Sequence, residues 1–201
     1  QDYAKHIPSA MAGIGKGVLK NLMIAYEARL NSPLTSSAGR LFDAVAALTG
    51  VRQSVNYEAQ AAIEMEMLAD EDVKTAYPFV VSEDSANTGQ PYYNISVDES
   101  IKAVLYDLHR GVSLETISGK FHNTAARIIA ETAEKAMAAY GVDRVVLSGG
   151  VFQNALLLNK TLSVFKRKGI KYYIHRQVPP NDGCISLGQA VIANYELKIK
   201  N

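Results

Sequence analysis

Apolar residues recur at spacings of three and four along the first part of the chain, which places them on one face of a helix. They predict a helix over residues 10–30 and a second helix that passes through Phe42 and ends at Gly50. The stretch Asn31-Ser32-Pro33 separates the two helices, and Thr35-Ser36-Ser37 can cap the second one.

The chain then changes from helix to strand. Apolar and acidic residues alternate over residues 57–69, which predict a third helix whose charged positions face water. Residues 78–81 and 92–97 are rich in β-branched and aromatic residues and predict two strands, with turn-forming residues between them.

Two further helices are expected after these strands. The first covers residues 98–109, and the second begins after a cap at Ser113 and ends near Tyr140. Gly119 and the polar residues 122–124 are expected to interrupt the second helix.

Strand and helix alternate regularly in the last third of the chain. The expected elements are a strand at 144–147, a helix at 154–168, a strand at 171–174 and a helix at 185–197. We therefore expect an α/β lobe with a mixed sheet flanked by helices.

Composition and charge exclude several classes of function. The formal net charge of +1 across 201 residues gives no electrostatic case for binding nucleic acid or an anionic membrane. The single cysteine, Cys184, excludes an intrachain disulfide and a CxxC metal motif. No stretch has the length to span a bilayer, so we expect a cytoplasmic protein. Because Gln1 stands where an initiator methionine would be, we expect the chain to be a piece of a longer protein.

The first candidate for chemistry is the loop Ser148-Gly149-Gly150-Val151, which follows a buried strand. Glycines let a backbone approach a ligand closely, and a following helix would present unsatisfied N–H groups to a phosphate or an adenosine. Asn154, in the first turn of that helix, could hydrogen-bond a base or a ribose. A tight turn that binds no ligand explains the glycines equally well.

The second candidate is the loop Asn181-Asp182-Gly183, which follows the next strand and two stiffening prolines. The carboxylate of Asp182 can ligate a cation or cap the last helix, and taken alone capping is favoured. Both loops follow strands of one β-α-β-α unit, however, and ligands collect at the carboxyl ends of such strands.

A third candidate is Asp43, which lies one helical turn from Gly39 and Arg40. It could accept hydrogen bonds from ribose hydroxyls or pair with Arg40 at the surface, and the residues alone do not separate these two interpretations.

The isolated histidines and the cysteine receive no role. His122 has no second histidine at ligand spacing, and His175 is predicted to be a partly buried residue at a strand end. Cys184 has no neighbouring histidine that would activate it.

Four stretches, in the family's order, resemble the C-terminal, TsaD-like domain of HypF, the carbamoyltransferase of nickel–iron hydrogenase maturation. The similarity runs from about Leu30 to Tyr195. The four stretches are Asn31 through Ala44, Lys120 through Thr124, Leu147 through Asn154, and His175 through Gln189.

This resemblance implies an actin-like, RNase-H-like ATPase fold, with residues 1–201 as its second lobe. A helical segment over 1–30 would lead into a nucleotide-binding α/β lobe over 31–198. The resemblance further implies that carbamoyl-adenylate, made from carbamoyl phosphate and ATP by another domain, binds between two lobes. The carbamoyl group would then pass to the C-terminal cysteine of the partner protein HypE.

The resemblance also assigns residues by position. Gly149, Gly150 and Asn154 would hold the adenosine part and Asp43 the ribose. Gly39, Ser148 and Val151 belong to the same nucleotide-binding set. Asp182 would be one ligand of an iron or zinc ion that polarises a carbamoyl or phosphoryl oxygen as a Lewis acid. No catalytic residue is assigned.

The chain departs from the family's pattern in several ways. The histidine-rich motif that pairs with the metal-binding aspartate does not occur, nor do the acylphosphatase-like, zinc-finger and adenylate-forming domains. We therefore expect the remaining metal ligands to lie outside this chain and the isolated chain to be inactive. Cys184 and Ala59 stand where the family is expected to have glycine.

Two alternatives stay open. One is a related carbamoyltransferase, either the TsaD type that modifies tRNA or the type that carbamoylates antibiotics, although Asn31 through Asp43 and Val178 through Gly183 favour HypF. The other is a non-catalytic lobe that binds nucleotide or protein.

Overall fold

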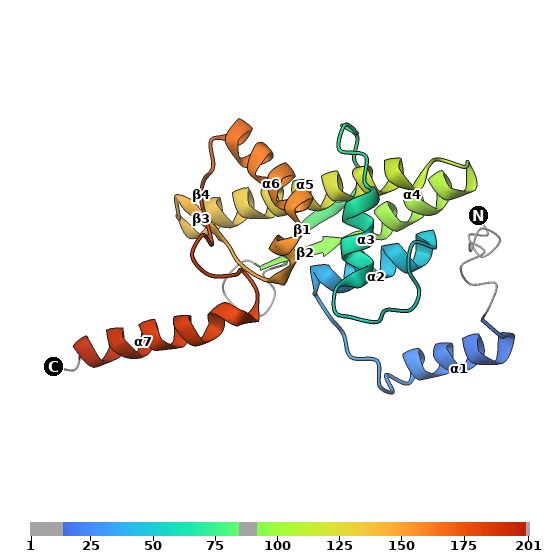
Figure 1. Cartoon of the computed structure of the whole chain (residues 1–201), viewed down its shortest axis with the longest axis horizontal. Coiled ribbons are helices and arrows are strands. Elements are labelled where there is room, and N and C mark those ends of the chain that lie inside the picture. Colours follow the sequence, from blue (N-terminus) through green and yellow to red (C-terminus); the bar gives the residue numbers. More distant parts are fainter. Residues whose placement is uncertain (1–13, 85–91, 200–201) are drawn as a thin grey trace. The chain divides into compact units, whose positions relative to one another are not determined.

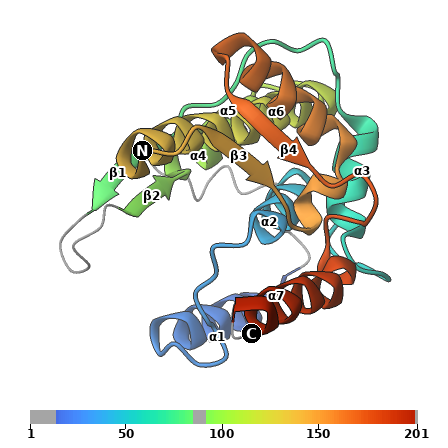
Figure 2. The same cartoon turned by 90° about the vertical axis from the view of Figure 1, so that its left-hand side faces the viewer.

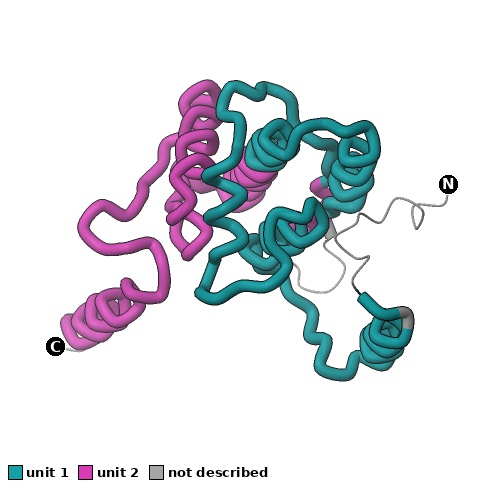
Figure 3. The backbone as a smooth tube through the Cα atoms, turned by 45° about the vertical axis from the view of Figure 1, so that its right-hand side comes forward, with its two compact units in different colours: residues 1–80, 96–124 teal, residues 81–95, 125–201 magenta. Residues whose placement is uncertain are grey.

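A computed structural model describes residues 14–84 and 92–199 of the chain (Figure 1). The chain divides into two compact units, each described by itself below. The first unit contains residues 1–80 and 96–124, and the second contains residues 81–95 and 125–201 (Figure 3).

The first unit is helical. Its helices are α1 (Lys16–Glu27), α2 (Ala38–Thr49), α3 (Gln60–Leu68), α4 (Asp98–His109) and the first part of α5 (Leu114–Tyr140). The predicted ends of α2 are confirmed. The backbone N–H of Arg40 donates to the Ser37 hydroxyl at 3.3 Å, and Gly50 closes the helix with a φ of 80°.

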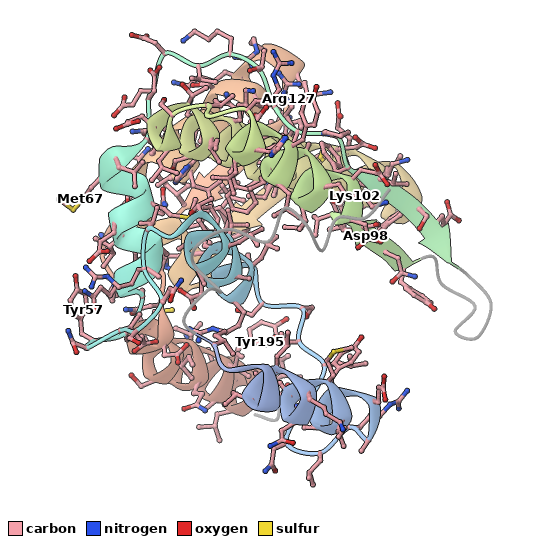
Figure 4. All side chains as sticks on the ribbon, turned by 90° about the vertical axis from the view of Figure 1, so that its right-hand side faces the viewer. Tyr57, Met67, Asp98, Lys102, Arg127 and Tyr195 are labelled. Atoms are coloured by element: carbon pink, nitrogen blue, oxygen red, sulfur yellow. The ribbon has the colours of Figure 1, made fainter. Side chains whose placement is uncertain are left out.

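The core of this unit lies between α2, α3, α4 and α5. The rings of Phe42 and Phe121 pack edge to face, with centroids 4.9 Å apart. Aliphatic side chains from α2, α4 and α5 and a methionine from α3 are fully buried around them: Val45, Met65, Val104 and Ile117. On the other side of α3, the Met67 side chain is exposed and points away from the ribbon (Figure 4).

The expectation that the acidic residues of α3 face water is wrong for Glu64. Its carboxylate accepts hydrogen bonds from Nε of Arg52 at 2.8 Å and from the Gln60 amide at 2.9 Å, and it is partly buried. These hydrogen bonds, the one from Arg52 first, lower the pKa of Glu64. The carboxylate thus ties the segment before α3 to the helix.

The interruption expected within α5 does not occur, because the helix runs unbroken over 27 residues. His122 contacts the Ser118 carbonyl within the helix through Nδ1 at 2.9 Å, and the Thr124 hydroxyl donates to the Lys120 carbonyl at 2.8 Å. The side-chain amide of Asn123 donates instead to the carbonyls of Val73 and Thr75, outside the helix. Gly119 serves a packing role, since a Cβ there would collide with the backbone carbonyl oxygen of Asp70.

The first predicted strand is displaced: β1 covers Val80–Asp84 and β2 covers Tyr92–Ser96. The preceding backbone is bound to helices instead. The N–H of Tyr77 donates to the Thr124 hydroxyl at 2.8 Å, and the carbonyl of Pro78 accepts from the Ser100 hydroxyl at 2.6 Å. Strand pairing therefore begins only after Pro78.

The second unit contains the predicted β-α-β-α segment. Its elements are β3 (Arg144–Leu147), a 3-10 turn (Gly150–Gln153), α6 (Ala155–Lys168), β4 (Lys171–Ile174), a second 3-10 turn (Asp182–Cys184) and α7 (Ile185–Ile199). The described strands form two separate two-stranded sheets, β1–β2 and β3–β4, rather than one mixed sheet. Both predicted strands of the segment have the expected bounds.

Strands β3 and β4 lie side by side and parallel, with Leu147 opposite Ile174 (Figure 2). Residues from α5 and α6, Ala130 and Phe165 among them, pack with Leu147 in the core of this unit. On the other face, the register partners Val146 and Tyr173 are 66% and 57% exposed. One face of the pair is therefore covered within the chain and the other is open.

Helix α7 is exposed at every position, including its apolar residues. Its exposed apolar residues are Ile185, Leu187, Val191, Ile192, Tyr195, Leu197 and Ile199. None of the helices that the structure describes is long and apolar enough to cross a lipid bilayer.

Candidate functional site

The two predicted loops leave the same edge of the β3–β4 pair. Because β3 and β4 are parallel and Leu147 is opposite Ile174, the next residues along each strand, Ser148 and His175, emerge together at the carboxyl edge. The loops that contain Gly149 and Asp182 follow from these two positions (Figure 2). This is the edge at which open α/β sheets bind ligands.

Two hydrogen bonds tie the loops to each other. The imidazole Nε2 of His175 lies 3.0 Å from the Ser148 hydroxyl. The backbone N–H of Gly149 donates to the carbonyl of Pro180 at 2.7 Å. The two loops are thus connected at their start and again just before Asn181.

Sequence reasoning missed the contact between Ser148 and His175. His175 is partly buried at a strand end, as predicted, but its partner was not foreseen. The signal was present in the lengths of the two strands, because equal four-residue strands in parallel register bring the residue after each one to neighbouring places.

Gly149 adopts a conformation that only glycine tolerates. Its φ of 112° and ψ of 151° lie where a Cβ would clash with the backbone. A 3-10 turn then covers Gly150–Gln153. The expectation that a helix follows the glycines directly is therefore wrong, because α6 begins only after this turn. The first N–H groups of such a turn have no partner within the turn itself. Binding of a ligand by the N–H groups of Gly150 and Val151 stays a prediction.

Asn154 is the N-cap of α6. Its Oδ1 accepts a hydrogen bond from the backbone N–H of Leu157 at 2.7 Å, and the residue is 9% exposed. The carboxamide oxygen therefore has a structural task. Binding of adenosine by the carboxamide nitrogen stays a prediction.

In the second loop the cap is Asn181, not Asp182. The Asn181 side chain accepts from the backbone N–H of Gly183 at 3.0 Å. The carboxylate of Asp182 is exposed and makes no hydrogen bond or ion pair with the residues that the structure describes. Asn181 thus caps the 3-10 turn that leads into α7, and the cation interpretation of Asp182 stays a prediction.

The described residues do not form a metal site by themselves. Within residues 14–84 and 92–199, no three His, Cys, Asp or Glu side chains converge on one point. Asp182 contributes one carboxylate, and His122 is fully buried in the core of the other unit.

Asp43 and Gly39 lie on α2, in the first unit. The carboxylate of Asp43 forms an ion pair with Arg40 at 3.0 Å, and its side chain is 26% exposed. This is one of the two interpretations left open by the sequence. An ion pair so near the surface is weak and does not prevent the carboxylate from meeting a ribose, so that role stays a prediction.

Ala59 has a positive φ of 62°, in the left-handed region that favours glycine. It precedes α3 and occupies the N-cap position without a side-chain cap. The backbone thus keeps the conformation suited to the glycine that the family is expected to have here.

Comparison with known proteins identifies relatives along most of the chain. A family model, the second subdomain of the Kae1-like domain of the carbamoyltransferase HypF, matches residues 4–189. The carbamoyltransferase HypF of Synechocystis is 34% identical over 179 residues, which cover 85% of this chain and 21% of that protein. The HypF of Rhodobacter capsulatus is also 34% identical, over 84% of this chain and 21% of its own length. The chain thus spans about a fifth of the length of these relatives.

Solved structures agree with the sequence relatives. Full-length HypF in a phosphate- and nucleotide-bound form superposes on 98% of this chain with a TM-score of 0.87 and 35% identity, and this chain covers 30% of it. The chain therefore has the α/β architecture of HypF, whose Kae1-like domain is an actin-like ATPase fold. The match of residues 4–189 to the second subdomain of that domain shows that the chain belongs to the HypF carbamoyltransferase family.

Proposed function

We propose that this chain is the nucleotide-binding part of a HypF carbamoyltransferase. The whole protein would make carbamoyl-adenylate from carbamoyl phosphate and ATP and transfer the carbamoyl group to the C-terminal cysteine of HypE. This reaction belongs to nickel–iron hydrogenase maturation. The observation that carries the proposal is the pair of joined loops at the carboxyl edge of β3 and β4.

The joined loops are suited to bind the adenylate. Gly149 and Gly150 have no side chain to keep a ligand from the backbone. The first N–H groups of the following 3-10 turn can donate hydrogen bonds to the oxygen atoms of a phosphate or to the oxygen and nitrogen atoms of an adenosine. The structure of full-length HypF with bound phosphate and nucleotide supports the same choice of ligand.

The transfer itself is an acyl substitution. The thiolate of the HypE cysteine would attack the carbamoyl carbon, and a C–S bond would form. The C–O bond between the carbamoyl carbon and the phosphate of the adenylate would break, and AMP would leave with the electron pair. The role of this chain would be to hold the adenylate while the thiolate approaches.

Other parts of the protein would complete the site. Helix α7 is rich in apolar residues and exposed at every position, which is typical of helices that are covered in the whole protein. The open face of the β3–β4 pair also exposes large apolar side chains, those of Val146 and Tyr173. We propose that other domains of the same protein cover these surfaces, bring Asp43 to the ribose and add the ligands that would join Asp182 at an iron or zinc ion.

Substitution of Asp182 by alanine in the full-length protein tests the proposal. We expect carbamoyl transfer to HypE to be lost, measured as the mass increase of HypE, while release of pyrophosphate during adenylate formation persists. Asp143→Ala is the matched control, because Asp143 precedes β3 at the opposite end of the strand and pairs with Arg144 at 2.7 Å. Retained transfer in Asp182→Ala would exclude Asp182 from the site.

A further inference from the structure

The carboxyl edge of β3 and β4 contains one polar pair to which the family resemblance gives no joint role, Ser148 and His175. We propose that the hydrogen bond between them positions the Gly149 turn, so that nucleotide affinity depends on His175 although His175 does not touch the nucleotide. The inference rests on the proposed function, because it concerns the same site. It assigns a role to His175, which the sequence had left without one.

The register of the strand pair places Ser148 beside His175. The parallel register ends where Leu147 is opposite Ile174, and the chain then turns into the 3-10 segment on one side and the proline loop on the other. Nε2 of His175 lies 3.0 Å from Oγ of Ser148, which is a hydrogen-bond distance. This side-chain contact continues the pairing of β3 with β4 by one residue beyond the strands. The hydrogen bond therefore lies directly before the residue whose conformation is most demanding.

Gly149 is restrained on both sides in a conformation that is open to glycine alone. With a φ of 112° and a ψ of 151°, this residue lies in one of the several regions open to glycine, so contacts from its neighbours select this one. Its own N–H is held by the Pro180 carbonyl at 2.7 Å, and Ser148 directly before it is held by His175. Both restraints come from the segment between β4 and the second 3-10 turn, so that segment sets the shape of the glycine turn.

Ser148 and His175 differ, among the described residues, from an activated serine–histidine pair. A serine activated by a histidine needs a third group that orients the imidazole. Nδ1 of His175 contacts no carboxylate or carbonyl among the residues that the structure describes. The pair lacks that part, and its geometry fits a positioning role.

A double-mutant cycle in the full-length protein tests the inference, with ATP as the probe and isothermal titration calorimetry as the measurement. We expect Ser148→Ala and His175→Ala each to weaken ATP binding by roughly 3- to 10-fold, the effect of one hydrogen bond. The double variant should bind ATP as tightly as the single variant with the lower affinity, because both substitutions remove the same contact. His175→Gln, whose amide nitrogen can reach the place of Nε2, should restore most of the affinity.

Ser163→Ala is the matched control. Its hydroxyl donates to the Asn159 carbonyl within α6, at 2.8 Å, and lies outside both loops. We expect its ATP affinity to equal that of the wild type. Additive losses in the cycle, or a loss in Ser148→Ala without one in His175→Ala, would mean that Ser148 meets the nucleotide directly and would overturn the inference.

Amide hydrogen exchange without nucleotide separates this inference from the proposed function. We expect residues 148–153 to exchange faster in His175→Ala and at the wild-type rate in His175→Gln. If the wild type bound no ATP, the proposed function would fail, whereas faster exchange would still support positioning by His175. Unchanged exchange in His175→Ala would contradict the inference whatever the affinity for ATP.

Discussion

At the scale of single residues, Asn154 has two separable tasks. Its side-chain oxygen caps α6, and its side-chain nitrogen is the predicted contact to adenosine. Asn154→Ala removes both groups, so we expect it to lower the free energy of unfolding by about 1 kcal/mol and also to weaken adenosine binding. Asn154→Asp keeps a capping oxygen but replaces the N–H donor by a second oxygen and adds a negative charge.

The aspartate variant therefore decides between the two tasks. We expect Asn154→Asp to melt near the wild-type temperature and to bind ATP more weakly than the wild type. Calorimetry of unfolding and of ATP binding on the same samples measures both quantities. Wild-type affinity in Asn154→Asp would leave Asn154 as a helix cap and nothing more.

Tyr77 links stability to alkaline pH. Burial, together with its hydrogen bond to Asp107 at 2.9 Å, raises the pKa of the phenol far above its usual range. In the unfolded chain a tyrosine loses its proton near pH 10, so above that pH the unfolded state releases a proton that the folded state keeps. The stabilisation is complete below about pH 10 and is lost as the pH rises further.

The comparison with Tyr77→Phe measures this effect. We expect the wild type to be more stable than Tyr77→Phe at pH 8, because Asp107 keeps its hydrogen bond, and the difference to shrink steadily above about pH 10. Urea unfolding at a series of pH values provides the measurement. A difference that stays constant up to pH 11 would show that the phenol is not held protonated.

At the scale of secondary structure elements, local patterns predicted most of the helices and strands. Helix α2 follows from the spacing of its apolar residues and from its cap at Ser37, and strands β3 and β4 follow from their short apolar runs. The continuity of α5 did not follow, because Gly119 is required by the carbonyl of Asp70, 49 positions earlier in the chain. A contact between distant segments leaves no local pattern to recognise.

Gly119→Ala tests the packing role of this glycine. Alanine normally stabilises a helix relative to glycine by about 0.5–1 kcal/mol, but here its Cβ would displace the backbone at Asp70. We expect the variant to lower the free energy of unfolding by about 1–3 kcal/mol. Gly39→Ala in α2, where the new Cβ would lie 3.6 Å from the Ser37 hydroxyl, is the control and should not lose stability. Equal stabilisation of both variants in urea unfolding would contradict the account of α5.

At the scale of the whole molecule, the meeting of the two glycine-bearing loops at one edge could be predicted from the sequence, but the contacts between them could not. The β-α-β-α pattern and the two glycine-bearing loops led to the carboxyl edge of β3 and β4 without any structure. The contact of Ser148 with His175 and the capping by Asn154 and Asn181 depend on register and on side-chain direction. Those details follow only from the folded chain.

The central claim is that the Gly149 turn binds nucleotide, and the ATP affinity of Gly149→Ala in the full-length protein tests it most directly. Gly141→Ala is the matched control, since Gly141 also has a positive φ, of 63°, but lies before β3, at the opposite end of the strand. Both variants strain the backbone by about 1–3 kcal/mol. We predict at least a roughly tenfold loss of ATP affinity in Gly149→Ala and wild-type affinity in Gly141→Ala, measured by calorimetry. Wild-type affinity in a folded Gly149→Ala variant would contradict the claim.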